Sequence, residues 1–220
     1  MPCATIAFVV FQSLRGRCAA AALALFAPVA GFAASPVLQY LTYLGGNGVD
    51  RIGAAASDSA GNLVIAGYTT STNFPGTQAA LPAGASIFVS KINSSGSALL
   101  FTTILGTDVV SNSFAVNGNF DSVSSAAVDN DDAIYVAGTT SAANFPVSAN
   151  AWSKGPRASF VVKLDISGRL LYATYLPFSM RPTRIQVRNG IAYVAGTFKD
   201  RKSTRLNSSH VSESRMPSSA

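Results

Sequence analysis

The chain has few of the side chains that enzymes most often use for proton transfer and nucleophilic attack. Its only histidine is His210 and its only glutamate is Glu213, both close to the end of the 220 residues. In the preceding residues, acid–base work would fall on Asp, Lys or Tyr, and a serine nucleophile would have no imidazole partner. We therefore expect a protein that is not an enzyme and that uses no cofactor.

Cysteine is almost absent as well. The two cysteines, Cys3 and Cys18, both lie near the N-terminus. Arg15 and Arg17 precede an apolar run over residues 18–29, which is the pattern of a secretory signal peptide. If this segment is removed, the mature chain has no thiol and cannot be stabilised by disulfides.

The apolar run is about a dozen residues long, too short to cross a bilayer core of ~30 Å as a helix. Gly31 and Ala33 supply the small residues that cleavage near Ala33 requires. We predict a signal peptide over residues 1–33, a secreted or cell-surface protein, and no membrane span after cleavage. An uncleaved anchor that also uses residues 5–11 is the alternative, and the two arginines count against it.

The net charge of +6 comes from the two ends of the chain. Between residues 34 and 198 there are nine Lys and Arg against eight Asp, a net of +1. A nucleic-acid-binding domain concentrates its basic residues on one face or along one element. The charge distribution therefore gives no support for a nucleic-acid partner.

The strongest positive feature is an internal repeat. The segment AGYTTSTNFP at residues 66–75 returns as AGTTSAANFP at residues 137–146, and a third copy begins with YVAGT at residues 193–197. The two longer copies follow an apolar, β-rich run and end in Asn-Phe-Pro. This pattern is typical of a strand that leaves its sheet into a tight turn.

From residue 37 onward, short β-rich runs alternate with Gly, Asn, Ser and Pro turns, and no segment keeps a helical period. We therefore expect an all-β chain with repeat units at about 37–93, 98–165 and 169–197, the third lacking its fourth strand. About ten extra residues fall between 107 and 120 in the second unit. The strands expected in the first unit are 37–44, 52–57, 63–69 and 87–93, and the second unit opens with 98–105.

These motifs, in this order, resemble the SBBP repeat, a β-propeller repeat of bacterial secreted and surface proteins. The residues that carry the resemblance are YLTYLGG at 40–46, DSAGN at 58–62, AGYT and NFP within 66–75, and KIN with SGSAL within 91–99. The resemblance covers residues 37–197 and implies a β-propeller fragment, with two four-stranded blades plus a truncated third. It implies no established activity and no catalytic residue. The chain departs from the pattern at Gly106-Thr107 and at Leu176-Pro177, where the pattern has Leu-Gly-Gly.

Residues 199–220 differ from the repeats. This stretch contains seven Ser and no β pattern, and it replaces the Thr-rich loop and Asn-Phe-Pro expected after the third strand of the repeat. We interpret it as a non-native, disordered tail of the kind that vector read-through produces. A native Ser-rich disordered C-terminus is the alternative.

An acidic cluster is the sharpest candidate for metal binding. Asp129, Asp131 and Asp132 could offer carboxylate oxygens to a hard cation such as Ca²⁺. The equivalent segment of the first unit, residues 58–62, reads as an ordinary turn, and Asp favours turns for its own local hydrogen bonds. We therefore expect turn chemistry here and no metal.

Two further groups invite a glycan-related interpretation. Asp50 and Asp121 occupy equivalent positions before a strand, and paired carboxylates serve glycoside hydrolysis. Repeat-equivalent residues are more simply explained by the same local hydrogen bonds in each unit. Phe74, Phe145 and Trp152 could form an aromatic platform for sugars, but Leu81 stands where the tryptophan does, so we expect all three in the core.

Together these features favour a secreted, non-catalytic interaction or adhesion module of a larger surface protein, with loops at one end of the blades binding a protein or glycan. Two alternatives stay open: a secreted carbohydrate-active hydrolase or lyase whose catalytic residues lie in missing blades, and a purely structural spacer. We also expect the first and last blades to expose apolar faces, so that residues 34–198 alone do not form a stable closed monomer.

Overall fold

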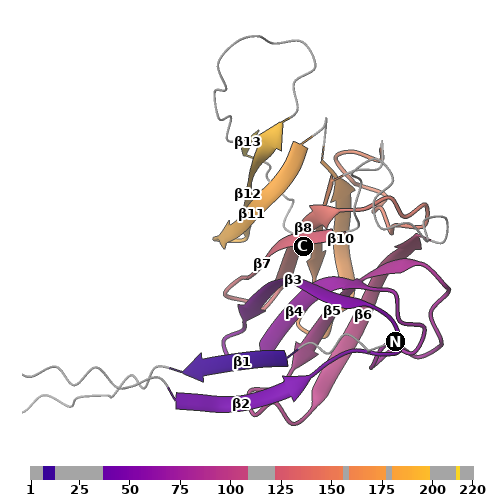
Figure 1. The fold of residues 1–220 in the computed structure, drawn as a ribbon. Coiled ribbons are helices and arrows are strands. Elements are labelled where there is room, and N and C mark those ends of the chain that lie inside the picture. Colours follow the sequence, from indigo (N-terminus) through magenta and orange to yellow (C-terminus); the bar gives the residue numbers. More distant parts are fainter. Residues whose placement is uncertain are drawn as a thin grey trace, which may run out of the picture.

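The computed structural model describes residues 7–12, 37–108, 122–155, 159–176, 180–198 and 212–213. Every regular element in these residues is a β-strand, which confirms the expectation of an all-β chain (Figure 1). Within the described residues there is no helix of the length and apolar character that crossing a membrane requires.

The strands form four antiparallel sheets. The first sheet contains β3 (Asp50–Ser57), β4 (Leu63–Thr69), β5 (Ala85–Ile92) and β6 (Leu99–Asp108), and the second contains β7 (Ser122–Val128), β8 (Ile134–Thr139), β9 (Ser159–Leu164) and β10 (Leu170–Tyr175). The third contains β11 (Met180–Arg188), β12 (Ile191–Phe198) and β13 (Ser212–Glu213), while β1 (Ala7–Gln12) and β2 (Val37–Tyr43) form a separate pair. In the first and second sheets each strand pairs with the next strand of the chain.

The sheets are out of phase with the predicted repeat units by one strand. We expected the strand near 37–44 to open the first sheet and the strand near 98–105 to open the second. Instead, β2 lies outside the first sheet, and β6 closes it. The reason is local: a tight turn with Gly96 at φ +71° joins β5 to β6, and short hairpins pair the strands that they connect.

Two hydrophobic clusters hold the three sheets face to face. Val64 and Ala66 of β4 share one cluster with Val136 of β8, between the first and second sheets. Tyr135, the neighbour of Val136 along β8, belongs to the other cluster with Ile185 of the third sheet. Since successive side chains of a strand point to opposite faces, β8 contributes to both clusters.

The stack is tightest along the first strand of each sheet. The backbones of β3 and β7 approach one another closely, as do those of β7 and β11, whereas β6 and β10 make no comparable contact. A methyl group at Gly53 of β3 would lie only 1.8 Å from the carbonyl oxygen of Val123 in β7. The sheets therefore converge at their first strands.

A loop protects the outer edge of the second sheet. The segment after Phe145 runs along β10: Ser148 N donates to Ala173 O, and Ala173 N donates to Ser148 Oγ, at 2.9 and 2.8 Å. Further along, Tyr175 N donates to Ser153 O at 3.1 Å. These bonds satisfy backbone groups that an open edge strand would leave unpaired.

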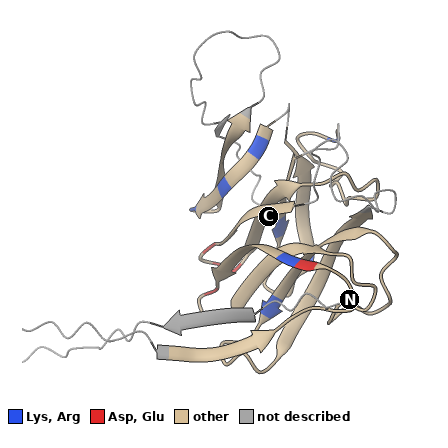
Figure 2. Ribbon diagram, viewed as in Figure 1, with Lys and Arg blue, Asp and Glu red and all other residues tan. Residues whose placement is uncertain are grey.

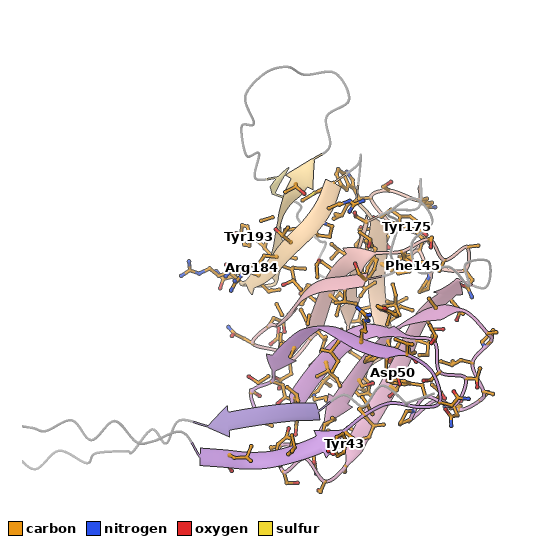
Figure 3. The ribbon with its side chains drawn as sticks, in the orientation of Figure 1. Tyr43, Asp50, Phe145, Tyr175, Arg184 and Tyr193 are labelled. Carbon is orange, nitrogen blue, oxygen red and sulfur yellow. The ribbon has the colours of Figure 1, made fainter. Side chains whose placement is uncertain are left out.

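The exposed face of the third sheet corrects the expectation of an apolar surface there. Arg184, Gln186 and Tyr193 lie on this face, with Tyr193 36% exposed. Arg184 extends away from the ribbon in Figure 3, and basic positions mark the third sheet in Figure 2. In the first sheet, Ala54 and Val64 occupy the positions equivalent to Arg184 and Tyr193, and both pack into a core cluster. The last described sheet thus carries a largely polar face.

The predicted terminal segments lie mostly outside the described residues. Of the predicted signal peptide, 1–33, the structure describes only β1, which pairs with β2. Of the tail, 199–220, it describes only β13, where Glu213 lies opposite Tyr193 of β12. The expectation of a disordered tail without β structure is wrong at these two residues, because β12 offers an edge that any backbone can join.

Candidate functional site

The acidic cluster does not converge on one point. Asp129 Oδ1 accepts hydrogen bonds from the backbone N–H groups of Asp131 and Ala133 at 3.0 and 2.9 Å, and its other oxygen accepts one from Tyr135 at 3.0 Å. The side chain of Asp131 is exposed, and Asp132 binds a different sheet. Within the described ranges, no group of three His, Cys, Asp or Glu side chains is placed to hold a metal ion.

Asp132 instead links the second sheet to the first through hydrogen bonds to Ser59. Its two carboxylate oxygens accept hydrogen bonds from the backbone N–H and hydroxyl of Ser59, at 2.8 and 2.7 Å. Asp132 has a left-handed backbone, with φ +59°, and its repeat equivalent is Gly61, with φ +78°. These hydrogen bonds lower the pKa of Asp132. An acidic residue thus occupies a conformation that favours glycine, and it connects two sheets from there.

A buried ion pair involves Asp58, the residue before Ser59 in the same turn. Lys91 Nζ is 2.6 Å from Asp58 Oδ2, and both side chains are nearly inaccessible to solvent. Burial opposes ionisation of Asp58, but hydrogen bonds from Lys91 and Asn62 outweigh it and lower its pKa. Lys91 also donates to the carbonyl oxygen of Ile166 in the second sheet, at 3.4 Å. The pair therefore fixes a turn and contributes to the contact between sheets.

The second sheet places different groups at the same positions. Lys163, the equivalent of Lys91, lies over the ring of Tyr135, 5.2 Å from its centroid. The Tyr135 hydroxyl in turn reaches Asp129, the equivalent of Asp58. Burial, followed by the charge of Asp129, raises the pKa of this tyrosine. The tyrosine ring has replaced the direct ion pair.

Asp50 organises the loops at the opposite end of the first sheet. It is 3% exposed, and its oxygens accept hydrogen bonds from the hydroxyls of Thr69 and Ser71 and from the backbone N–H of Gly46. Beside it, Asn47 N donates to Asn73 Oδ1 at 2.7 Å. This network explains why Gly-Gly-Asn and Thr-Ser-Thr-Asn occur in one unit, since the two segments bind one another.

The suggested pair of catalytic carboxylates gains no support from Asp50. Its oxygens are occupied by neighbouring hydroxyl and N–H groups, and it points into the protein (Figure 3). Asp121, its predicted counterpart, lies outside the described residues.

Two of the three candidate aromatic residues belong to the core. Phe74 packs on Phe88 with ring centroids 4.5 Å apart, and Phe145 packs on Phe160 at 4.9 Å. Phe145 also packs on Tyr175, with ring centroids 5.3 Å apart; both residues are labelled in Figure 3. Core packing is therefore confirmed for Phe74 and Phe145. It is wrong for Trp152, which is 58% exposed because its loop lies outside the edge of the second sheet.

A groove of about 600 Å³ lies between β6, the outer strand of the first sheet, and the turn that joins β9 to β10 in the second sheet. Three segments line it: the loop 76–81, residues 100–104 of β6, and the turn 167–169 between β9 and β10. Leu100, which is 51% exposed, supplies an apolar side chain, while Gln78 and Arg169 supply polar ones. This mixture suits a ligand with both apolar and hydrogen-bonding surface.

Arg169 is held in place beside the groove. Its Nε donates to Asp165 Oδ2 at 3.0 Å, while the rest of the side chain is largely exposed. Partial burial of Asp165 is outweighed by hydrogen bonds from Ser167 and Arg169, which lower its pKa to about 2. This groove could not be predicted from the sequence, because it forms between segments of two different sheets.

In comparison with known proteins, neither a protein-family model nor a curated protein matches this chain.

Proposed function

We propose that the chain is a run of β-propeller blades that serves as a secreted or cell-surface, non-catalytic binding module for a protein or glycan. Three features of the stack support the blade interpretation: four-stranded antiparallel meanders, face-to-face packing of successive sheets, and convergence at the first strand of each sheet. Propellers arrange typically 4–8 such sheets around a channel. The motifs shared with the SBBP repeat point the same way.

A binding role, and not a catalytic one, is favoured because the buried and turn carboxylates already accept hydrogen bonds from neighbouring groups. The carboxylates that could do chemistry are used as acceptors within turns and between sheets, as Asp50, Asp58, Asp129 and Asp132 show. The groove at the outer strands is the observation that carries the proposal, because it combines Leu100, Gln78 and Arg169 in one concave surface. Its open form suits an extended chain that lies along the surface.

Glycan and peptide arrays probed with the labelled full chain test this proposal. The variant Arg169→Ala should weaken capture of any ligand by about tenfold, the loss expected for a charge-assisted hydrogen bond. Gln78→Ala should weaken it by a smaller factor, because the hydrogen bonds of a neutral amide are weaker. Arg188→Ala is the control, since this exposed arginine lies on the third sheet, away from the groove. Arrays on which the full chain captures nothing, or ligands that Arg169→Ala retains unchanged while Arg188→Ala loses them, would refute the proposed surface.

A further inference from the structure

β2 stands in the same relation to the first sheet as β6 does to the second. The ring of Tyr40 in β2 covers Gly96, where an added methyl group would lie 2.2 Å from the ring. The ring of Phe101 in β6 covers Gly168 in the same way, at 2.4 Å. Both glycines lie in the turn between the last two strands of a sheet. β2 therefore has the position of an outer strand that belongs to a sheet preceding the first.

The pairing of β2 repeats a detail of the other two outer strands. In β6, Leu100 is skipped in the pairing with β5, and in β10, Leu171 is skipped in the pairing with β9. In β2, Gln39 is skipped at the equivalent place. Bulges of this kind are reproducible features of related strands. β2 thus has the local form of β6 and β10. Its one partner strand among the described residues is β1, whereas β6 and β10 each belong to a four-stranded sheet.

The side chains of β2 lack the cover that their equivalents have. Tyr43 is 65% exposed, whereas Tyr175 at the same position of β10 is 3% exposed. Leu38 and Leu41 are also exposed by about half, at 53% and 51%. Leu170, the equivalent of Leu38, packs against the core between the first two sheets. An apolar strip on β2 is therefore open where its counterparts are packed.

One buried polar atom also lacks its counterpart's partner. The hydroxyl of Tyr40 is buried and makes no hydrogen bond with any described residue. The equivalent hydroxyl, on Tyr172 of β10, accepts a hydrogen bond from the backbone N–H of Trp152 at 3.0 Å. That donor comes from the loop that runs along the edge of the second sheet. A buried hydroxyl without a partner costs free energy. Among the described residues, β2 therefore has no counterpart of the loop that runs along β10.

We propose that β2 is an acceptor for an incoming antiparallel strand that replaces β1. The two sheets define the incoming sequence. Lys91 and Lys163 lie opposite Phe101 and Tyr172, the equivalents of Tyr40. Phe88 and Phe160 lie opposite Ile104 and Tyr175, the equivalents of Tyr43. The partner strand therefore has the pattern Phe-Val-x-Lys followed by Ile or Leu, with its lysine opposite Tyr40 and its phenylalanine opposite Tyr43.

β1 occupies this position without matching the pattern. It pairs in the same register, but it places Val10 opposite Tyr40 and Ala7 opposite Tyr43. The proposal is independent of the ligand-binding role, because it concerns how strands assemble at β2 and makes no use of the groove. Failure of either proposal leaves the other standing.

A peptide with the sequence of Ser159–Gly168, labelled at its N-terminus, tests the proposal by fluorescence anisotropy. In the full chain, Val9→Pro removes a backbone donor and disrupts the pairing of β1 with β2. The peptide should bind this variant about tenfold more tightly than the unaltered chain, because apparent affinity follows the fraction of chains with an open strand. Val10→Pro is a second way to free β2 and should give the same result.

Disulfide trapping then tests the register. A peptide with cysteine in place of Val161 should crosslink to Thr42→Cys, because Val161 pairs with Thr174, the equivalent of Thr42, in the second sheet. The background carries Cys3→Ser and Cys18→Ser. Thr103→Cys is the matched control, since β5 already occupies that position of β6. Equal crosslinking of the two cysteines, equal binding of a shuffled peptide, or no binding to either proline variant would overturn the proposal.

Discussion

Replacement of Lys91 by methionine should destabilise the protein more than the same change at its repeat equivalent, Lys163. Lys91 lies 2.6 Å from Asp58 with both side chains almost inaccessible. Breaking a buried ion pair from one side costs about 3–5 kcal/mol, because the remaining charge is left buried. Asp58 keeps hydrogen bonds from Ala60 N, Asn62 N and Asn62 Nδ2. We therefore expect the lower end, about 3 kcal/mol, or roughly 6–12 °C in Tm for a chain of this size.

Lys163→Met is the matched control. Lys163 is partly exposed and contacts the ring of Tyr135 from 5.2 Å, a contact of about 1 kcal/mol or less. Thermal melts of the two variants beside the unaltered chain measure the difference. Equal losses of Tm, or a larger loss for Lys163→Met, would refute the assignment of the buried pair to the first sheet.

The same pair predicts a pH dependence. Folding lowers the pKa of Asp58, so the contribution of this carboxylate to stability is complete above the pKa of an unfolded aspartate, ~3.9. That contribution is lost as the pH falls through the lower pKa of the folded state. Lys91→Met removes the group that holds the carboxylate charged. Tm measured between neutral pH and pH 3 should therefore fall less steeply for the variant than for the unaltered chain.

Three further predictions use other contacts. Gly53→Ala should lower Tm by several degrees, because its methyl group meets the carbonyl oxygen of Val123 between sheets, whereas Gly155→Ala should be neutral, since nothing lies within 4 Å of its methyl position. Asp132→Ala should melt below Asp132→Gly, because both lose the bonds to Ser59 but only glycine relaxes the left-handed backbone, and the reverse order would contradict that reading. EDTA should leave Tm unchanged in melts with and without added calcium, and a fall of several degrees would show that the turn at Asp129 binds metal.

Much of the strand pattern could be predicted from the sequence, because it rests on local features. The apolar runs that lead into Gly67 and Gly138 belong to β4 and β8. The burial of Phe74 and Phe145 follows from large apolar side chains at equivalent repeat positions. Which four consecutive strands form one sheet could not be predicted from these local features. A repeating pattern has no intrinsic starting point, and the connections 44–49 and 93–98 are equally long. β6 rather than β2 joins the first sheet because the turn 93–98 forms a hairpin, closed by the hydrogen bond from Asn93 N to Ala98 O at 2.9 Å.

Other features arise only from contact between sheets. Asp132 was assigned to its own turn, but its oxygens bind Ser59 in a neighbouring sheet, 73 positions away in the chain. Trp152 was placed in the core because it is a large apolar residue at the repeat position of Leu81, yet its loop runs outside β10. The polar face of the third sheet could have been noticed, since Arg184 and Gln186 are charged or polar in a strand. Arg184 and Gln186 lie two positions apart, so strand alternation assigns them to one face, and the bulge at Thr183 changes the alternation only before them.

The central claim, that these sheets are consecutive blades of a larger ring, is tested most directly by the oligomeric state of residues 34–198. This fragment lacks β1, so β2 keeps neither a paired strand nor cover for Leu38 and Tyr43. Open strands and exposed apolar side chains recruit other chains. Size-exclusion chromatography with light scattering should therefore show oligomers or aggregates. A monodisperse monomer that melts in one sharp transition would show that the sheets form a self-sufficient stack and would contradict the claim.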